Sequence, residues 1–147
     1  MISDENDKKI KRLAKKFDRV LVDAPCTGTG TWRRNPDTRA KYSDLDLEHM
    51  MSLQDRILAS AARLTKPGGY LVYVTCSLLQ EENEDRITAL LSRRKDYKIV
   101  PIQKIWDEQV TVKGGGKCPT KLEMLRLTPK EHNTDGFFAA VLRRDLD

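Results

Sequence analysis

Residues 19–26 read RVLVDAPC and decide the fold class. Residues 20–22 form a short apolar run rich in branched side chains, and a proline follows, which is typical of a buried strand. Residues 70–77 read YLVYVTCS and repeat this arrangement. Each run therefore places a cysteine, Cys26 or Cys76, directly after a predicted strand.

A long amphipathic helix is predicted between these two strands. Apolar residues recur at helical spacing over residues 47–64, and Ser43 or Asp44 is available as the N-cap. A second helix over about residues 82–92 and a third strand over residues 97–101 follow. This alternation predicts an α/β sheet with mostly parallel strands and right-handed crossovers.

The ends of the chain have weaker patterns. A helix is expected over residues 7–16. Residues 102–123 have no clean period and contain three consecutive glycines, which favours a loop. Residues 124–127 and 136–142 are apolar runs separated by a polar turn, so they predict a C-terminal antiparallel hairpin.

The two cysteines are the candidate reactive groups. Ligands of an open parallel sheet bind beyond the carboxyl ends of its strands. Neighbouring strands lie about 4.8 Å apart, so Cys26 and Cys76 are expected to face one substrate. The alternative is that each cysteine is a small buried hydrophobe. A reactive thiolate needs nearby positive charge, which Arg33, Arg34 or a cationic cofactor can supply.

Composition excludes several classes of protein. Apolar residues make up 39% and charged residues 33% of the 147, which argues against disorder and against a membrane span. The start of the chain has no signal-peptide pattern, so a cytoplasmic protein is expected. Three cysteines predict free thiols, and neither their spacing nor that of the two histidines predicts a metal site.

The net charge of +5 favours an acidic partner such as nucleic acid. Arg33, Arg34, Arg39 and Lys41 follow the first cysteine and are the candidates for contacts with phosphates. The basic residues between positions 8 and 16 are interpreted as a solvated helix face. Gly28 and Gly30 lack the third glycine of a dinucleotide fingerprint, so they predict a loop that lets another backbone or a base approach closely.

The sequence resembles the Nol/Nop/Sun family of S-adenosylmethionine-dependent RNA cytosine-5 methyltransferases, most closely its bacterial ribosomal-RNA branch. The resemblance rests on motifs that occur in the same order along the chain: residues 23–30 and 33–36, Gln54, Ile57 and Leu58, residues 67–73, 75–77 and 82–84, and residues 134–138.

The resemblance implies a role for three residues. Cys76 would be the nucleophile that adds to carbon 6 of cytosine, and Cys26 would help to release the methylated product. Asp23 would lie beside the methyl donor, S-adenosylmethionine, and the base. The pattern alone leaves the attacking cysteine open, because DNA cytosine-5 methyltransferases use the position that corresponds to Cys26.

The chain also departs from the family. It lacks the first strand, the glycine-rich turn with a lysine and the acidic residue that hold the cofactor, and it lacks an N-terminal RNA-binding domain. Residues 1–147 are therefore expected to be the C-terminal half of a Rossmann-like methyltransferase domain, inactive when isolated. The strand over residues 19–22 is expected to have an open edge, which would favour a homodimer unless the first helix covers it.

The sequence leaves two other functions open. One is a non-catalytic module that binds RNA or completes the site of a separate N-terminal half. The other is a thiol oxidoreductase or cysteine hydrolase, which the absence of a Cys-x-x-Cys pair and of an obvious histidine partner disfavours.

Overall fold

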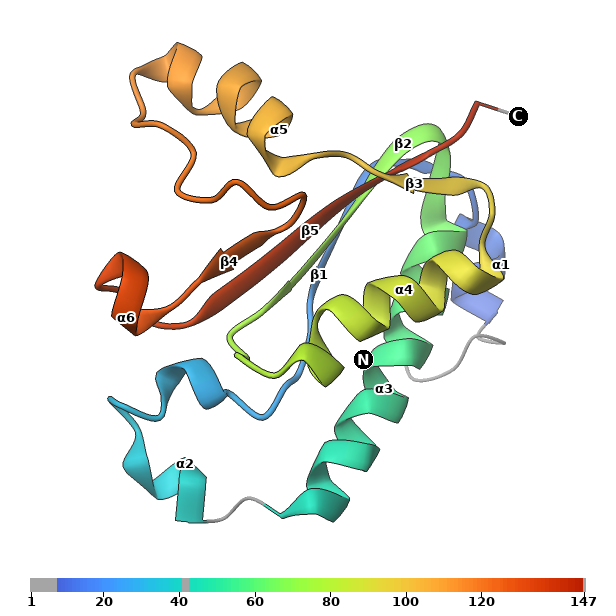
Figure 1. The fold of residues 1–147 in the computed structure, drawn as a ribbon. Helices are drawn as coiled ribbons and strands as arrows, with labels where there is room; N and C mark the ends of the chain where they lie inside the picture. The colour runs from blue at the N-terminus through green and yellow to red at the C-terminus, as the bar shows by residue number, and fades with distance from the viewer. Residues whose placement is uncertain (1–7, 41–42, 147) are drawn as a thin grey trace.

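The structure is a computed structural model that describes residues 8–40 and 43–146. Its sheet has the order β1-β2-β5-β3, and β4 also pairs with β5 (Figure 1). β1 runs parallel to β2, whereas β5 is antiparallel to β2, β3 and β4. Four strands thus share one direction, which confirms the predicted mostly parallel sheet with a C-terminal antiparallel hairpin. The strands are β1 (Phe17–Asp23), β2 (Thr65–Thr75), β3 (Tyr97–Ile99), β4 (Leu125–Leu127) and β5 (Phe137–Arg144).

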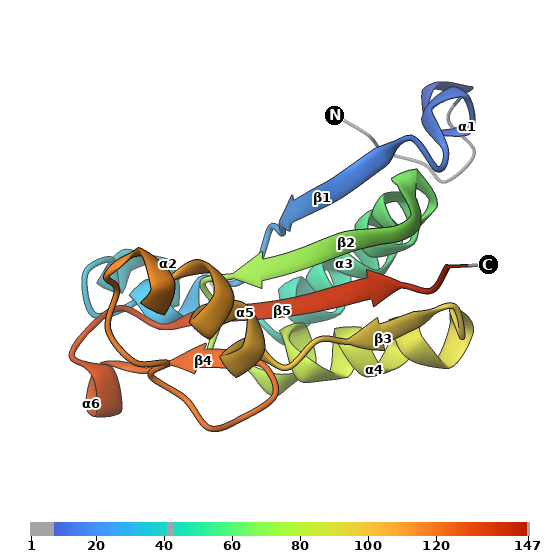
Figure 2. The ribbon, with the colours of Figure 1, turned by 90° about the horizontal axis from the view of Figure 1, so that it is seen from above.

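Helices cover both faces of the sheet. Figure 2 shows α3 and α4 on one face and α5 on the other. The helices are α1 (Lys8–Leu13), α2 (Pro36–Ala40), α3 (Asp44–Leu64), α4 (Glu84–Arg93), α5 (Ile102–Gln109) and α6 (Pro129–His132), and the 3-10 turns are η1 (Thr29–Thr31), η2 (Gln80–Glu82) and η3 (Thr111–Lys113). Ser43 is the N-cap of α3, and its backbone N–H donates to Asp46 Oδ2 (2.9 Å).

The main core lies between the sheet and the helix pair α3 and α4. Leu58 of α3 and Ile87 of α4 are 1% exposed, and they pack with Tyr73 and Phe138 from the central strands. The Tyr73 and Phe138 rings meet edge to face, with centroids 6.3 Å apart. Burial of side chains of this size stabilises the fold by about 1.5–3 kcal/mol each. This core fixes β1 and β2 side by side and so positions the loops that follow them.

α5 is a helix where the sequence predicted a loop. Ile102, Ile105 and Trp106 have helical spacing, and they pack on the second face of the sheet with Leu125 and Val141. The prediction of a loop was therefore wrong for residues 102–109 and for the turn η3. Three apolar residues over two turns are too few for a clear periodic signal, and the sheet face supplies the remaining stabilisation.

β2 begins earlier than predicted. The helix α3 ends at Leu64, and the residues Pro67, Gly68 and Gly69 already belong to the strand. The pairing of β1 with β2 shifts register between Phe17 and Arg19, which accommodates these residues. At Gly69 a β-carbon would lie 2.9 Å from the carbonyl oxygen of Asp18, so the close approach of the two strands there requires glycine.

β1 is an edge strand, as the sequence predicted, because among the described strands it pairs only with β2. The alternative in which the first helix covers this edge was wrong. α1 lies beyond the start of β1 (Figure 2), and the residues after it donate to the end of α3, from Lys15 N–H to Arg63 O (2.9 Å) and from Lys16 N–H to Leu64 O (3.1 Å). α1 also ends at Leu13 instead of residue 16.

Candidate active site

Cys26 and Cys76 lie together at the carboxyl ends of β1 and β2. The parallel pairing continues past the strand end, where Ala24 N–H donates to Val74 O (3.0 Å). The Sγ atoms of the two cysteines are 3.4 Å apart, and both side chains are half-buried. The structure therefore brings the two thiols to one point, where a single substrate can contact both.

The contact between the two thiols shifts their pKa values in opposite directions. A hydrogen bond from Cys26 lowers the pKa of the Cys76 thiol to about 7, because it stabilises the thiolate. The same hydrogen bond raises the pKa of Cys26, and burial and repulsion by Cys76 add to this effect. Because the thiolate is the nucleophilic form of cysteine, Cys76 is the sulfur better prepared to attack near neutral pH.

Asp23 ends β1 with an exposed side chain. Its negative charge raises the pKa of Cys76, by less than the hydrogen bond from Cys26 lowers it. The carboxylate is therefore within electrostatic reach of the thiol. A carboxylate at this position fits a positively charged sulfonium group by charge attraction.

The basic residues after Cys26 lie in the loop that contains η1 and α2. Arg34 Nη2 lies 2.5 Å from Asp135 Oδ2, and Arg33 Nη2 lies 4.0 Å from Asp135 Oδ1. Both arginine side chains remain more than 60% exposed, and Arg39 in α2 is also exposed. Lys41 lies outside the described residues. The expectation that Arg33 or Arg34 acidifies a thiol was wrong for Cys76, because its pKa is lowered chiefly by Cys26.

A buried polar network joins the loop of Cys26 to the segment after Cys76. Glu82 and Gln54 are 0% exposed. Glu82 Oε1 accepts from Thr27 N–H (2.9 Å) and from Gln54 Nε2 (3.0 Å), and Glu82 Oε2 accepts from the Thr27 hydroxyl (2.5 Å). Gln54 Nε2 also donates to Pro25 O (2.9 Å). The residues on both sides of Cys26 are thus fixed by two buried side chains.

Asn83 fixes the turn that contains Cys76. Its Oδ1 accepts from the Thr75 hydroxyl (2.6 Å), and its Nδ2 donates to Ser77 O (2.9 Å). The Thr75 hydroxyl oxygen in turn accepts from Ser77 N–H (3.1 Å). Asn83 therefore determines the direction in which Cys76 leaves the strand.

Gly30 and Gly136 allow three loops to pack closely together, namely the loops that contain Gly30, Cys76 and Gly136. Gly30 N–H donates to Cys76 O (2.9 Å), and Gly136 N–H donates to Gly30 O (2.9 Å). A β-carbon on Gly30 would lie 2.6 Å from Cys76 O and 2.6 Å from Gly136 Cα. The prediction that this loop permits close approach of another backbone is confirmed.

The network residues Gln54, Glu82 and Asn83 belong to the motifs of the resemblance, but the sequence pattern predicted no role for them. Gln54 occupies an apolar position of the helical repeat, between Met51 and Ile57. A polar residue on a core-facing position must find partners, so this was the signal that a buried hydrogen-bonded site lies against α3.

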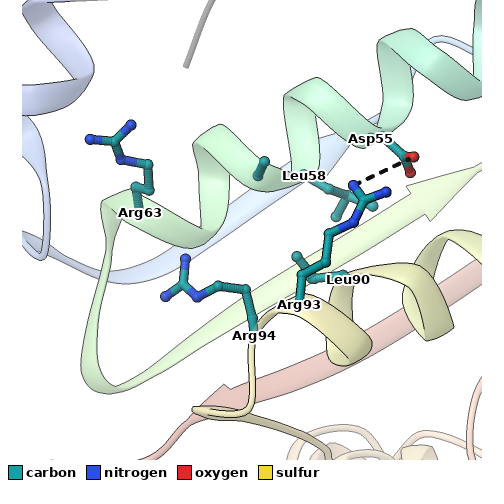
Figure 3. Close-up of a pocket in the computed structure, with 7 residues that line it drawn as sticks. Asp55, Leu58, Arg63, Leu90, Arg93 and Arg94 are labelled. Carbon is teal, nitrogen blue, oxygen red and sulfur yellow. Dashed lines mark ion pairs between the residues drawn. The ribbon is translucent and has the colours of Figure 1, made fainter. Parts of the chain in front are cut away.

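A pocket lies between α3 and α4, and neither cysteine lines it (Figure 3). Arginines line it, and aspartates pair with two of them. Arg93 Nη1 lies 3.9 Å from Asp55 Oδ2, and Arg94 donates to both carboxylate oxygens of Asp96 (2.8 Å each). Over the described residues, no group of three or more His, Cys, Asp or Glu side chains is arranged to hold a metal ion, and no helix is long and apolar enough to span a membrane.

The family model of the 16S rRNA methyltransferase RsmB/F matches residues 1–143. The chain belongs to the RsmB/F family. Ribosomal RNA small subunit methyltransferase B of Shewanella oneidensis is 40% identical over 126 residues, which are 86% of this chain and 27% of that protein. The protein of the same name from Pectobacterium atrosepticum is 37% identical over 129 residues, with 88% and 27% covered.

Solved structures show the same fold. The crystal structure of NSun6 from Pyrococcus horikoshii with SFG has a TM-score of 0.71 and 31% sequence identity, and the match covers 95% of this chain and 33% of that one. The resemblance seen in the sequence is confirmed by these relatives. The chain spans about a quarter of the length of the two RsmB/F relatives named here.

Proposed function

We propose that this chain carries the two catalytic thiols of an enzyme that methylates carbon 5 of cytosine in ribosomal RNA. The observation that carries the proposal is the 3.4 Å contact between Cys26 Sγ and Cys76 Sγ, in which Cys76 is the more acidic thiol. Membership in the RsmB/F family of 16S rRNA methyltransferases supports the substrate class.

S-adenosylmethionine, of which SFG is an analogue, is the proposed cofactor and supplies a methyl group on a positively charged sulfur. The Cys76 thiolate adds to carbon 6 of the ring, and the displaced ring electron pair makes carbon 5 able to accept that methyl group. Carbon 5 then loses its proton to solvent, and Cys76 leaves as a thiolate. A hydrogen bond from Cys26 stabilises the departing sulfur, just as it stabilises the free thiolate.

Asp23 is proposed to lie beside the sulfonium and the base. Arg33, Arg34, Arg39 and Lys41 are proposed to bind the phosphates that flank the target cytosine, which must be unpaired to reach a thiol. We place this activity in the cytoplasm, with the ribosomal RNA.

We further propose that the isolated chain is inactive and that a segment outside it completes the cofactor site. The support is the share of the relatives that the chain covers, about a quarter. The same fact favours a second candidate, a non-catalytic module that binds RNA or complements a separate N-terminal half.

The test is a chimera in which the 126 residues of this chain that match the Shewanella oneidensis relative replace the corresponding segment of that relative. With S-adenosylmethionine and RNA that contains 5-fluorocytidine, carbon 5 has no proton to lose, so a covalent complex should accumulate. We expect Cys76→Ser to abolish this complex. On unmodified RNA, Cys26→Ala, which removes the donor to the departing sulfur, should accumulate the complex by slowing release. If the folded chimera forms the complex without Cys76, the assignment of the nucleophile is wrong; RNA binding without methyl transfer supports the non-catalytic module.

A further inference from the structure

Glu82 is a fully buried carboxylate that the proposed reaction does not use. It lies in η2, six residues after Cys76, and its side chain is 0% exposed. A buried carboxylate is costly unless its oxygens accept hydrogen bonds. Three neutral donor groups satisfy them here, and two of these belong to Thr27, the residue after Cys26.

The hydrogen bonds of Glu82 reach both cysteine segments. Its carboxylate accepts from the backbone N–H and the hydroxyl of Thr27, which restrains the loop of Cys26 in two places. Its backbone carbonyl accepts from the Tyr73 hydroxyl (2.7 Å), on β2, the strand that precedes Cys76. Glu82 therefore links β2 to the loop that carries Cys26.

We propose, on the basis of the proposed function, that Glu82 is a positioning residue that holds Cys26 in hydrogen-bond contact with Cys76. Glu82 acts through Thr27 and Gln54, and it contacts neither sulfur in this role. Its effect on the reaction is to keep the Cys26 thiol aimed at Cys76 before attack and again when Cys76 departs.

Two physical effects of Glu82 on Cys76 have opposite signs. As a negative charge, Glu82 raises the pKa of Cys76, as Asp23 does. As a positioning residue, it preserves the hydrogen bond from Cys26, which lowers that pKa and is the larger effect. Among the described residues, Cys26, Asp23 and Glu82 are the ionisable groups with the largest effects on the pKa of Cys76. Removal of the Glu82 charge alone would therefore lower the pKa of Cys76, whereas displacement of Cys26 would raise it.

The experiment is the pH profile of iodoacetamide alkylation at Cys76, followed by peptide mass spectrometry on the whole chain. We expect Glu82→Gln to raise the apparent pKa of Cys76 toward the ordinary thiol value of about 8.5. Alkylation at pH 7 should slow several-fold, up to about tenfold if the contact is fully lost. Glu81→Gln removes the same charge from the exposed neighbouring position and should leave the profile unchanged.

A double variant tests whether Glu82 acts through Cys26. In a Cys26→Ala background, Glu82→Gln should no longer raise the pKa of Cys76, because the hydrogen bond that it protects is already absent. A merely structural role would lower the melting temperature and leave the alkylation profile in place. An unchanged or lowered pKa in the folded Glu82→Gln chain overturns the proposal.

Thr27→Val provides the same test if Glu82→Gln fails to fold. It removes only the hydroxyl that donates to Glu82 Oε2, and Thr27→Ser should restore the wild-type profile. A raised pKa in Thr27→Val supports the proposal, and an unchanged one overturns it. The assay requires no RNA, cofactor or methyl transfer, so its failure is distinguishable from failure of the proposed function.

Discussion

The sulfur atom of Cys26 lies 3.4 Å from that of Cys76, although 50 residues separate them in the chain. β1 and β2 produce this contact because they are parallel neighbours, and each cysteine follows the carboxyl end of its strand by one to three residues. In such a pair, the proton held by one thiol stabilises the thiolate of the other, so the two groups titrate together.

Cys26→Ala should make Cys76 less acidic. Alkylation of Cys76 in the wild-type chain should rise through an apparent pKa of about 7, because Cys26 donates to its thiolate. Without that donor the pKa should rise to about 8.5, and the rate at pH 7 should fall about tenfold. Cys26→Ser keeps a hydrogen-bond donor, so the pKa of Cys76 in this variant should lie between its values in the wild type and in Cys26→Ala. Cys118→Ala, away from the pair, is the control; an unaltered profile in Cys26→Ala would contradict the hydrogen bond.

Gly30→Ala should destabilise the chain and separate the loops beneath the thiols. The new β-carbon would lie 2.6 Å from Cys76 O, 2.6 Å from Gly136 Cα and 2.7 Å from Gly136 O, and all three are backbone atoms that cannot rotate away. We expect a loss of about 1–3 kcal/mol in urea unfolding. Gly116→Ala is the matched control, because a β-carbon there has no neighbour within 4 Å. Equal effects of the two substitutions would show that the loops tolerate a wider spacing.

The order of β1, α3, β2 and α4 was predictable because each element has a strong local signal, such as the apolar run of residues 20–22 or the helical repeat of residues 47–64. The position of the cysteines followed from the rule that sequential parallel strands pair. α5 was not predictable, because Ile102, Ile105 and Trp106 form a helix only when the sheet buries them. The partners of Glu82 lie 28 and 55 residues away, and such pairings arise only from the folded backbone.

Asp96→Asn should reduce stability in a manner that depends on pH. Hydrogen bonds from Arg94 hold the pKa of Asp96 at about 2, and Arg144, which is buried, places its Nε 2.9 Å from the same carboxylate. A lowered carboxyl pKa contributes stability above the unfolded value of 3.8, and this is lost as the pH falls toward 2.

Because Asp96 is partly exposed, we expect Asp96→Asn to cost about 1 kcal/mol at pH 7, measured by urea unfolding. The difference from the wild type should shrink between pH 4 and pH 2. Asp145→Asn, which breaks the exposed pair with Lys98, should cost less. A difference that persists at pH 2 would show that packing, and not charge, stabilises this corner.

Arg33→Ala combined with Arg34→Ala should weaken RNA binding and its dependence on salt. Both guanidinium groups are exposed on the loop after Cys26. Each lost phosphate contact on single-stranded RNA should lower the slope of log K against log salt by about 0.7. Lys104→Ala on α5 removes an exposed charge from another face and is the control. Filter binding at several salt concentrations measures the slope, and an unchanged slope would remove these arginines from the RNA interface.

Leu21→Lys should suppress self-association through the edge of β1. Leu21 is 68% exposed and Phe17 is 40% exposed. An apolar groove between β1 and α3 is lined by Val20, Leu21, Ile57 and Leu64. An exposed strand edge beside an apolar surface pairs readily with another strand, so the isolated chain should form dimers as its concentration rises. A lysine on this edge makes such pairing costly. Sedimentation velocity over a concentration series measures the effect, with Val112→Lys, at an exposed site in η3, as the control. If the wild-type chain stays monomeric throughout, the edge does not drive association between copies.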